Sequence, residues 1–219
     1  MKKILLTVAL ALVGGSAFAQ ISLGGGYLNN NGKVVKTLAD GSKTTESDKL
    51  QGFYVGASFD IPLGKGITIS PGAYYYYLTR RDNASVGSGT LGGSSNFVRN
   101  DHGISVPVNV KYGFEAVPGV LSIGVFAGPA FQYTFSSKEK QDITVVVGGA
   151  SSTSTQKYDN LQSGDLKPFD ITIGGGVYAD IVKMIRVSAG YNYGLLNRTG
   201  ADNTTLHYSG FHAGVAFIF

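Results

Sequence analysis

The feature that most constrains the fold is the last segment of the chain, residues 207–219, which reads HYSGFHAGVAFIF. With a period of two, one face carries Phe211, Ala213, Val215, Phe217 and Phe219, and the opposite face carries mostly small residues. The segment is about as long as a tilted membrane-crossing strand and ends on an aromatic residue. It is typical of the closing strand of a membrane β-barrel.

Residues 1–19 predict a secretory signal peptide. Lys2 and Lys3 precede an apolar run, and the run is followed by Ala17-Phe18-Ala19, a cleavage motif with small residues that places the expected cut before Gln20. The apolar run is too short for a spanning helix, and no later segment approaches the roughly twenty apolar residues that such a helix needs. We therefore expect a mature domain, residues 20–219, that meets the membrane as β-structure.

The composition excludes several classes of protein. The absence of cysteine excludes a disulfide framework, thiolate chemistry and cysteine-based metal sites. The 32 glycines and the low charged fraction of 15% suit neither a helical protein nor a disordered one. The net charge of +4 includes Lys2 and Lys3, which leaves +2 for the mature chain and predicts no nucleic-acid partner.

Eight segments of the mature chain alternate with a period of two, and no helical periodicity competes with them. We expect strands near residues 20–29, 51–62, 66–79, 102–114, 119–134, 168–182, 185–195 and 207–219.

The connections alternate between long polar segments and short turns. The long ones are residues 30–50, 80–101, 135–167 and 196–206, and the short ones are residues 62–65, 115–118 and 182–184. This order predicts an all-β fold, an eight-stranded antiparallel up-and-down transmembrane barrel with both mature termini in the periplasm. The fold of a soluble β-sandwich does not require long and short connections to alternate.

Volume decides which face of each strand points outward. An eight-stranded barrel is only just wide enough for side chains to fill it, so the bulky apolar face must face lipid and the small, polar face must line the lumen. The outward aromatic residues near segment ends then form interfacial girdles; they are Phe53, Tyr77, Tyr112, Phe114, Phe131, Tyr133 and Phe169.

Three prolines, Pro71, Pro107 and Pro129, lie inside the expected strands. Proline lacks the N–H that a strand ladder requires, and a closed barrel has no edge to accommodate it. We expect a bulge or a local gap in the ladder at each.

Four short motifs carry a family resemblance. They are ISVPVNVKY at residues 104–112, AGPA at 127–130, FDITIGGG at 169–176 and AGYNYGL at 189–195. Together they resemble the small outer-membrane β-barrel family common in the Bacteroidota, often called porin-family or PorT-like barrels. The resemblance implies an integral outer-membrane protein folded by the barrel assembly machinery, with an assembly signal in Phe211, Val215, Phe217 and Phe219. It implies no catalytic residue, since the family shares no active site.

A cluster of charged residues is expected in the lumen: Asp60, Lys111, Asp170, Asp180 and Arg186. Isolated buried charges cost several kcal/mol, so these groups must pair in a narrow barrel. We favour a salt-bridge plug over a gate for ions or protons, because interiors at eight strands are filled.

The histidines give weak functional signals. His207 and Ser209, outward on the last strand, resemble the His-x-Ser of lipid A deacylases, but no acidic residue follows Asp202 to orient such a base. His102 and His212 have no further ligand at suitable spacing. We therefore expect no catalytic residue, no metal and no cofactor.

The long connections are the remaining place for function. Arg80, Arg81 and Arg99, near the stems of residues 80–101, are predicted to contact lipopolysaccharide phosphates. Residues 135–167 contain an apolar run, two glycines and a Ser/Thr run, which indicate a hairpin that offers a strand edge to a partner. Mobile solvated loops are the alternative.

The sequence thus predicts a non-enzymatic outer-membrane protein with a structural or binding role in its external loops. A narrow channel for ions or small solutes is the alternative, and a lipid A-modifying enzyme is the third. The expected partners are outer-membrane lipids, lipopolysaccharide, the assembly machinery and a protein or surface ligand at the loops, and the expected state is a monomer.

Deletion of Phe219 should impair assembly in cells more than it lowers the stability of refolded protein, because the assembly signal ends at this residue. The two quantities are the cellular yield of barrel that runs as folded without heating on a gel, and the urea midpoint of the refolded protein. Equal losses would contradict the assignment.

Overall fold

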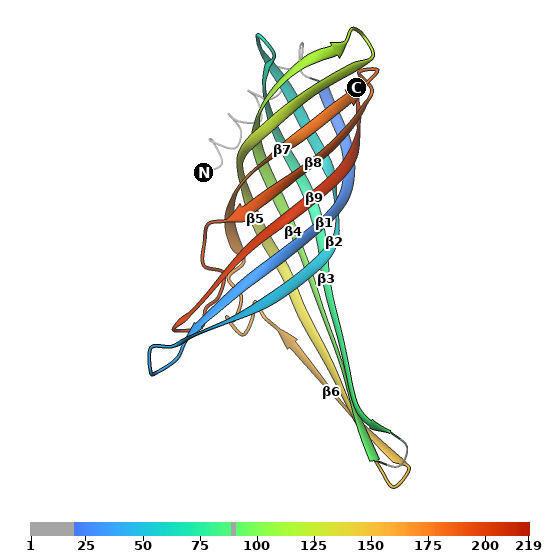
Figure 1. Cartoon of the computed structure of the whole chain (residues 1–219), viewed down its shortest axis with the longest axis vertical. Coiled ribbons are helices and arrows are strands. Elements are labelled where there is room, and N and C mark those ends of the chain that lie inside the picture. Colours follow the sequence, from blue (N-terminus) through green and yellow to red (C-terminus); the bar gives the residue numbers. More distant parts are fainter. Residues whose placement is uncertain (1–19, 89–90) are drawn as a thin grey trace.

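Eight antiparallel strands close into a ring in the computed structural model, which describes residues 20–88 and 91–219 (Figure 1). The expected signal peptide, residues 1–19, lies outside the described residues. In the part of the chain that is described, no helix is long and apolar enough to cross a membrane. The strands are β1 (Gln20–Thr37), β2 (Lys43–Gly64), β3 (Ile67–Ser88), β4 (Leu91–Val117), β5 (Leu121–Val147), β6 (Ala150–Asp159), β7 (Phe169–Ile181), β8 (Ile185–Gly194) and β9 (Thr204–Ile218).

The ring closes between the first and last strands. β1 pairs with β2 on one side and with β9 on the other, and β4 pairs with both β3 and β5. β5 continues the ring by pairing with β7, whereas β6 pairs with the distal part of β5 alone among the described strands. The eight-stranded up-and-down architecture expected from the sequence is confirmed.

The two ends of the barrel differ. The terminal end carries Gln20, Phe219 and the short turns at residues 65–66, 118–120 and 182–184. The loop end carries the longer hairpins and connections. Lys65, Val182 and Lys183 adopt positive φ angles of 52°, 47° and 59°, which let two of the turns reverse the chain within a few residues. The three short turns predicted from the sequence are confirmed at the terminal end.

The strands are much longer than the sequence predicted, and three of the expected loops were wrong. Most of residues 30–50, 80–101 and 135–167 belong to strands, which pair as far as Thr37 with Lys43, Ser88 with Leu91 and Val147 with Ala150. These segments carry polar residues on both faces over much of their length. The apolar alternation fades there although the strand continues, because no lipid covers one face.

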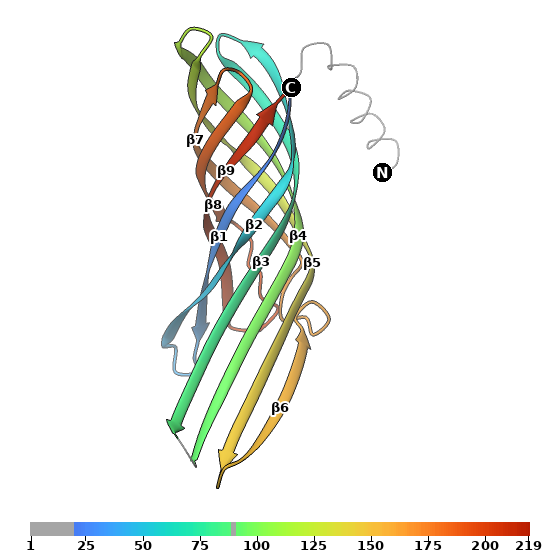
Figure 2. The same cartoon turned by 90° about the vertical axis from the view of Figure 1, so that its right-hand side faces the viewer.

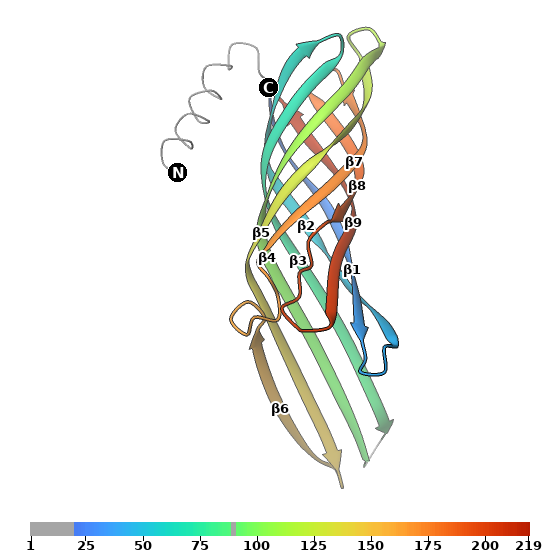
Figure 3. The ribbon, with the colours of Figure 1, turned by 90° about the vertical axis from the view of Figure 1, so that its left-hand side faces the viewer.

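A projecting sheet extends beyond the loop end. It consists of residues 80–88 of β3, 91–100 of β4, 138–147 of β5 and the whole of β6. Figures 2 and 3 show these strands continuing past the barrel as one sheet. The hairpin predicted within residues 135–167 is confirmed as β5 and β6, joined at Gly148 and Gly149, which both have positive φ.

The apolar face of each barrel strand points outward, as volume required. Outward residues such as Ile173 (54% exposed), Val177 and Phe217 stand on the outer surface, and six of the seven expected girdle residues are exposed. Tyr77 is half-buried by its aromatic neighbours. The inward face carries small and polar residues together with tyrosine rings.

The three prolines each lie in a gap of one ladder. The β2–β3 ladder skips Pro71, the β3–β4 ladder skips Pro107, and the β4–β5 ladder skips Pro129. The register is the same on both sides of each gap, so the face assignments hold. The expected ladder gaps are confirmed, and the register shifts occur elsewhere, between His102 and Gly103 among others.

Ile173→Arg should cost about 2–4 kcal/mol of folding free energy if this exposed residue lies near the middle of a bilayer. Val147→Arg is the matched control, since Val147 is equally exposed but lies at the tip of the projecting sheet, beyond the barrel. Urea titrations of folding into vesicles measure both. A cost near zero for Ile173→Arg would mean that the outward face does not contact lipid.

Candidate functional site

A network of four charged side chains fills the terminal end of the lumen. The Lys111 ammonium donates to Asp60 at 2.8 Å, and Arg186 donates to the other oxygen of Asp60 at 2.7 Å. Arg186 also donates to both oxygens of Asp180, at 2.6 and 2.7 Å. The network balances two cations with two carboxylates, so no charge within it is left without a counterion.

Strand register places these groups. Asp180 and Arg186 are direct partners in the ladder of β7 and β8, across the turn at residues 182–184. Asp60 and Lys111 reach the same level from β2 and β4. The Tyr178 ring lies beneath the cations, with its centroid 4.9 Å from the Arg186 guanidinium carbon. Four strands are therefore joined through side chains across the lumen.

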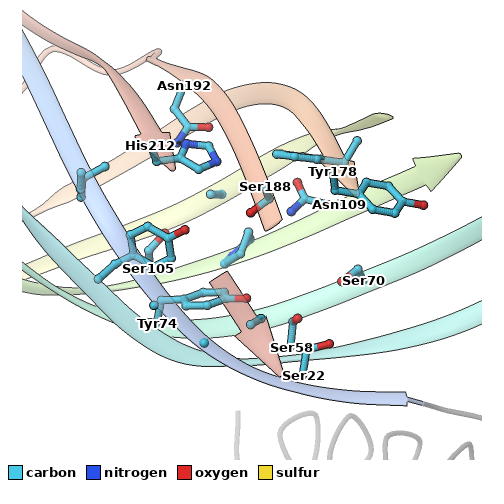
Figure 4. A pocket seen from close by; sticks show the side chains of 18 of the residues that line it. Ser22, Ser58, Ser70, Tyr74, Ser105, Asn109, Tyr178, Ser188, Asn192 and His212 are labelled. Carbon is cyan, nitrogen blue, oxygen red and sulfur yellow. Dashed lines mark hydrogen bonds between the residues drawn. The ribbon is translucent and has the colours of Figure 1, made fainter. Parts of the chain in front are cut away.

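Beyond this network the lumen contains a chamber of about 160 Å³. A separate cavity of about 300 Å³ opens at the terminal end. Lys111, Tyr178 and Arg186 line both cavities, so the terminal network forms the partition between them. Figure 4 shows Tyr74, Tyr178 and His212 among the side chains of the chamber, with Ser22, Ser58 and Ser70 gathered on one side.

Tyrosine rings occupy much of the lumen, and glycines make room for them. A Cβ on Gly103 would overlap the Tyr76 ring, and one on Gly113 would overlap the Tyr178 hydroxyl. The remaining chamber has both polar and apolar walls, and among its polar groups Asn192 Nδ2 lies 3.3 Å from His212 Nδ1. A chamber of this size with polar groups in its wall has room for a few water molecules.

A second network lies at the loop end of the lumen. Asp48 accepts hydrogen bonds from Arg80 (2.9 Å), Arg99 (2.8 Å) and the Tyr208 hydroxyl (2.8 Å). Arg99 also donates to both oxygens of Asp101, at 3.0 and 2.8 Å. Burial disfavours the charged form of Arg99, but the surrounding Tyr208, Asp101 and Asp48 raise its pKa above the ordinary value.

Apolar residues and two connections complete the closure at this end. Leu50, Leu78, Leu206 and Leu166 form a buried cluster with Tyr76 and Tyr208. Leu166 comes from the connection between β6 and β7, which pairs with the connection between β8 and β9 through Leu166 and Thr199. Arg198 fastens the two connections, since its side chain donates to the Lys167 carbonyl at 2.7 Å and to Thr134 at 3.0 Å.

The structure brings together four of the five lumen charges named from the sequence, Asp60, Lys111, Asp180 and Arg186. Asp170 lies apart, and its inclusion in the cluster was wrong. It lies on the same strand as Asp180 but about ten residues away, which is about 33 Å at a rise of about 3.3 Å per residue. Asp170 is fully buried near the loop end, 3.8 Å from Arg198.

Two of the three arginines expected to contact lipopolysaccharide face the lumen instead. Arg80 and Arg99 are ladder partners whose side chains both bind Asp48. Because successive side chains of a strand point to opposite faces, only Arg81 points outward. The prediction for Arg80 and Arg99 assumed a loop, and it fails because the strands continue through these positions.

His207 and His102 both lie on the outer surface of the barrel, as was predicted for His207. His207 is on the outward face, with its ring stacked on Tyr193 and Nδ1 3.3 Å from the Gly194 carbonyl oxygen. His102 Nδ1 lies 2.6 Å from the Tyr75 hydroxyl, outside the barrel. In residues 20–88 and 91–219, no group of three or more His, Asp or Glu side chains could hold a metal ion.

Sequence reasoning missed the loop-end network. Asp48 and Asp101 lie in segments that were interpreted as loops, and no partner was predicted for Tyr208. A signal was present: Asp48 with Leu50, and Leu78 with Arg80, are spaced two residues apart, as inward positions of one strand must be. Extending the alternation past the apolar segments would have found them.

The sequence profile described as outer membrane protein beta-barrel domain matches residues 16–200. The chain belongs to this outer-membrane β-barrel family. The family places the barrel in the outer membrane. None of the curated proteins compared with the sequence matches it significantly.

Several solved outer-membrane barrels are similar in fold to this barrel. Ail, the attachment invasion locus protein of Yersinia pestis, has 15% identity and a TM-score of 0.40, over 92% of this chain and 99% of Ail. Neisserial surface protein A has 13% identity and a TM-score of 0.40, over 92% and 97%. The N-terminal barrel domain of Pseudomonas aeruginosa OprF has 14% identity and a TM-score of 0.34, over 88% and 97%.

Asp60→Ala should destabilise the outer-membrane barrel by about 3–5 kcal/mol, because Lys111 and Arg186 would then share Asp180 as their one remaining carboxylate. Glu115→Ala is the control, since Glu115 forms an exposed pair with Lys183 and its loss should change the unfolding free energy little. Urea titration measures both. Equal costs would mean that the terminal network does not carry the stability assigned to it.

Proposed function

We propose that this outer-membrane barrel is a binding protein that acts through its projecting sheet, with a lumen that does not conduct. The observation that carries the proposal is a four-stranded sheet, amphipathic and open at both edges, at the end opposite the termini. With the termini in the periplasm, this sheet stands at the cell surface. The two side-chain networks that cross the lumen favour a function outside it.

Both edges of the projecting sheet lack a neighbouring strand among the described residues. β2 pairs with β3 only as far as Gln51 and Thr79, so β3 is one edge, and β6 is the other. An edge strand presents unpaired N–H and C=O groups to which another chain can add as a further strand.

One face of the projecting sheet is apolar near the tip. Val86 is 78% exposed and Leu91 is 68% exposed, and both continue the lumen-facing side of their strands. Ile143, Val145 and Val147 lie beside them on β5. Exposed apolar patches outside the membrane mark interaction sites.

The β6 edge is the better site for an added strand. Its residues on the apolar face, Ala150, Ser152 and Ser154, are small and stand directly beside Val147, Val145 and Ile143. A partner strand on β6 can therefore place apolar side chains against Ile143, Val145 and Val147, which we call the valine row. On the β3 edge, Arg80 and Asp82 pair with each other and obstruct the same face. The proposed partner is a protein with an extended, alternately apolar segment.

The finer family assignment is part of the proposal. The four short motifs support a Bacteroidota-type, PorT-like barrel of the porin family, exported from a Gram-negative cytoplasm by the signal peptide at residues 1–19. Both mature termini then lie in the periplasm, and the assembly machinery recognises Phe211, Val215, Phe217 and Phe219. The short turns at the terminal end support this orientation.

The two other functions have less support. A narrow channel requires a water path past the terminal network, in which Asp60, Lys111 and Arg186 are in direct contact. A lipid A-modifying enzyme requires a carboxylate beside His207, whose contacts are instead the Tyr193 ring and the Gly194 carbonyl. We therefore propose that the chain catalyses no reaction.

Selection of a phage-displayed peptide library on the refolded barrel tests the binding function. The comparison protein has residues 83–96 and 142–155 each replaced by Asn-Gly, which shortens both projecting hairpins and leaves the barrel strands intact. We expect extended, alternately apolar peptides to be enriched on the full chain alone. Enrichment that survives the trimming, or none at all, would refute the proposal.

Two pairs of substitutions on β6 then locate the site. Ser152→Lys with Ser154→Lys puts charges beside the valine row, and Ser151→Lys with Thr153→Lys puts the same charges on the opposite face. The first pair should weaken peptide binding at least tenfold, and the second should change it less than twofold. Equal effects would exclude the β6 edge.

A further inference from the structure

The outer surface of the barrel carries three successive rows of residues near the loop end. The first row is aromatic and runs across five neighbouring strands: Tyr27 opposes Phe53, Phe53 opposes Tyr77, and Tyr77 opposes His102. Phe135 on β5 extends it, with its ring 6.4 Å from that of His102. Aromatic residues of this kind occupy the boundary between hydrocarbon and water.

The second row lies two residues further along each strand and carries amide and hydroxyl groups. Its members are ladder partners: Asn29, Gln51, Thr79 and Asn100. The Tyr27 hydroxyl donates to Gln51 at 3.2 Å, and the Tyr77 hydroxyl donates to Asn100 at 2.8 Å. The first two rows are thus tied together, and the second offers hydrogen-bonding groups to a polar head group.

The third row is cationic and again lies two residues further along. It carries Lys49 on β2, Arg81 on β3, Lys140 on β5 and Lys157 on β6, and Lys140 and Lys157 are direct partners. Lys138, level with Asn100, adds a fifth exposed cation. At about 3.3 Å per residue, the third row stands about 13 Å along the strand beyond the aromatic row, or about 10 Å in height at a tilt of about 40°.

Two carboxylates share this face without cancelling its charge. Asp142 accepts from Lys140 at 2.7 Å, and hydrogen bonds from Lys140 and Thr155 lower the pKa of Asp142 below its ordinary value. Asp159 accepts from the backbone N–H groups of Leu161 and Gln162. Five cations against two carboxylates leave an excess of positive charge, which favours an anionic partner at this height.

We propose that the three rows form a binding surface for the phosphorylated sugar head groups of outer-leaflet glycolipids. The aromatic row meets the acyl boundary, the amide row meets sugar hydroxyls, and the cationic row pairs with phosphates. Of the three arginines predicted from the sequence to contact lipopolysaccharide phosphates, only Arg81 belongs to this surface. This inference rests on the barrel crossing the outer membrane and is independent of the partner proposed for the projecting sheet.

Energy transfer to a labelled glycolipid tests the proposal. The chain has no cysteine, so Ser42→Cys accepts a single donor dye in the β1–β2 hairpin. The full chain is refolded into phosphatidylcholine nanodiscs that contain acceptor-labelled diphosphoryl lipid A or its dephosphorylated form. Folding is checked by heat-dependent gel mobility. Energy transfer should show that diphosphoryl lipid A is enriched around the wild-type barrel and that the dephosphorylated form is not.

Two variants that lose the same number of positive charges distinguish binding at the cationic row from a general effect of net charge. The test variant carries Lys49→Gln, Arg81→Gln, Lys140→Gln and Lys157→Gln. The control carries Lys36→Gln, Lys43→Gln, Lys65→Gln and Lys183→Gln, at exposed cations outside the three rows. The test variant should bind diphosphoryl lipid A at least tenfold more weakly, and the control within twofold of wild type.

Three results would overturn the proposal. They are a test variant that binds like wild type, a control that loses as much binding as the test variant, and equal enrichment of the dephosphorylated lipid. The first would exclude the cationic row, the second would reduce the effect to net charge, and the third would exclude phosphate as the recognised group.

Discussion

The structure depends on the neutralisation of charge inside a barrel that is only just wide enough for side chains. Eight strands leave no room for a hydrated channel beside bulky residues, so each inward charge must find its counterion across the lumen. At the terminal end, Asp60 holds Lys111 and Arg186 together, and Asp180 completes the balance. At the loop end, Asp48 gathers Arg80, Arg99 and Tyr208 from three strands. These contacts join strands that the ladders alone do not bring together.

This constraint supports the proposal that the protein acts through the outside of the barrel. With charged networks at both ends of the lumen, the surfaces that we consider for interaction are the projecting sheet and the outer wall of the barrel. The same strands close the lumen and form the outer surface, because successive side chains along a strand point alternately inward and outward. Arg80 and Arg81 are an example of this alternation: Arg80 points inward and binds Asp48, and Arg81 points outward from the barrel.

The parts of the fold that contact lipid were predictable, because lipid forces the apolar alternation that a sequence displays. Hence the strands around Ile173 and Phe217 and the terminal charges near the short turns could be named in advance. Outside the membrane both faces of β3 to β6 are solvated, the alternation fades, and the strands through Arg80 and Arg99 were taken for loops. The missing strands also hid Asp48 and Asp101. Asp170 was misplaced for a different reason, since parity gives the face of a residue but not its height in the barrel.

Single-channel conductance of the refolded barrel in a planar bilayer tests the central claim most directly, that paired charges close the lumen. The protein is first shown to be folded by its heat-dependent gel mobility, and Lys111→Ala is recorded alongside. We predict no steady channels from the wild-type barrel. Steady channels whose ion selectivity changes with Lys111→Ala would contradict the claim, because they would show that ions pass the terminal network.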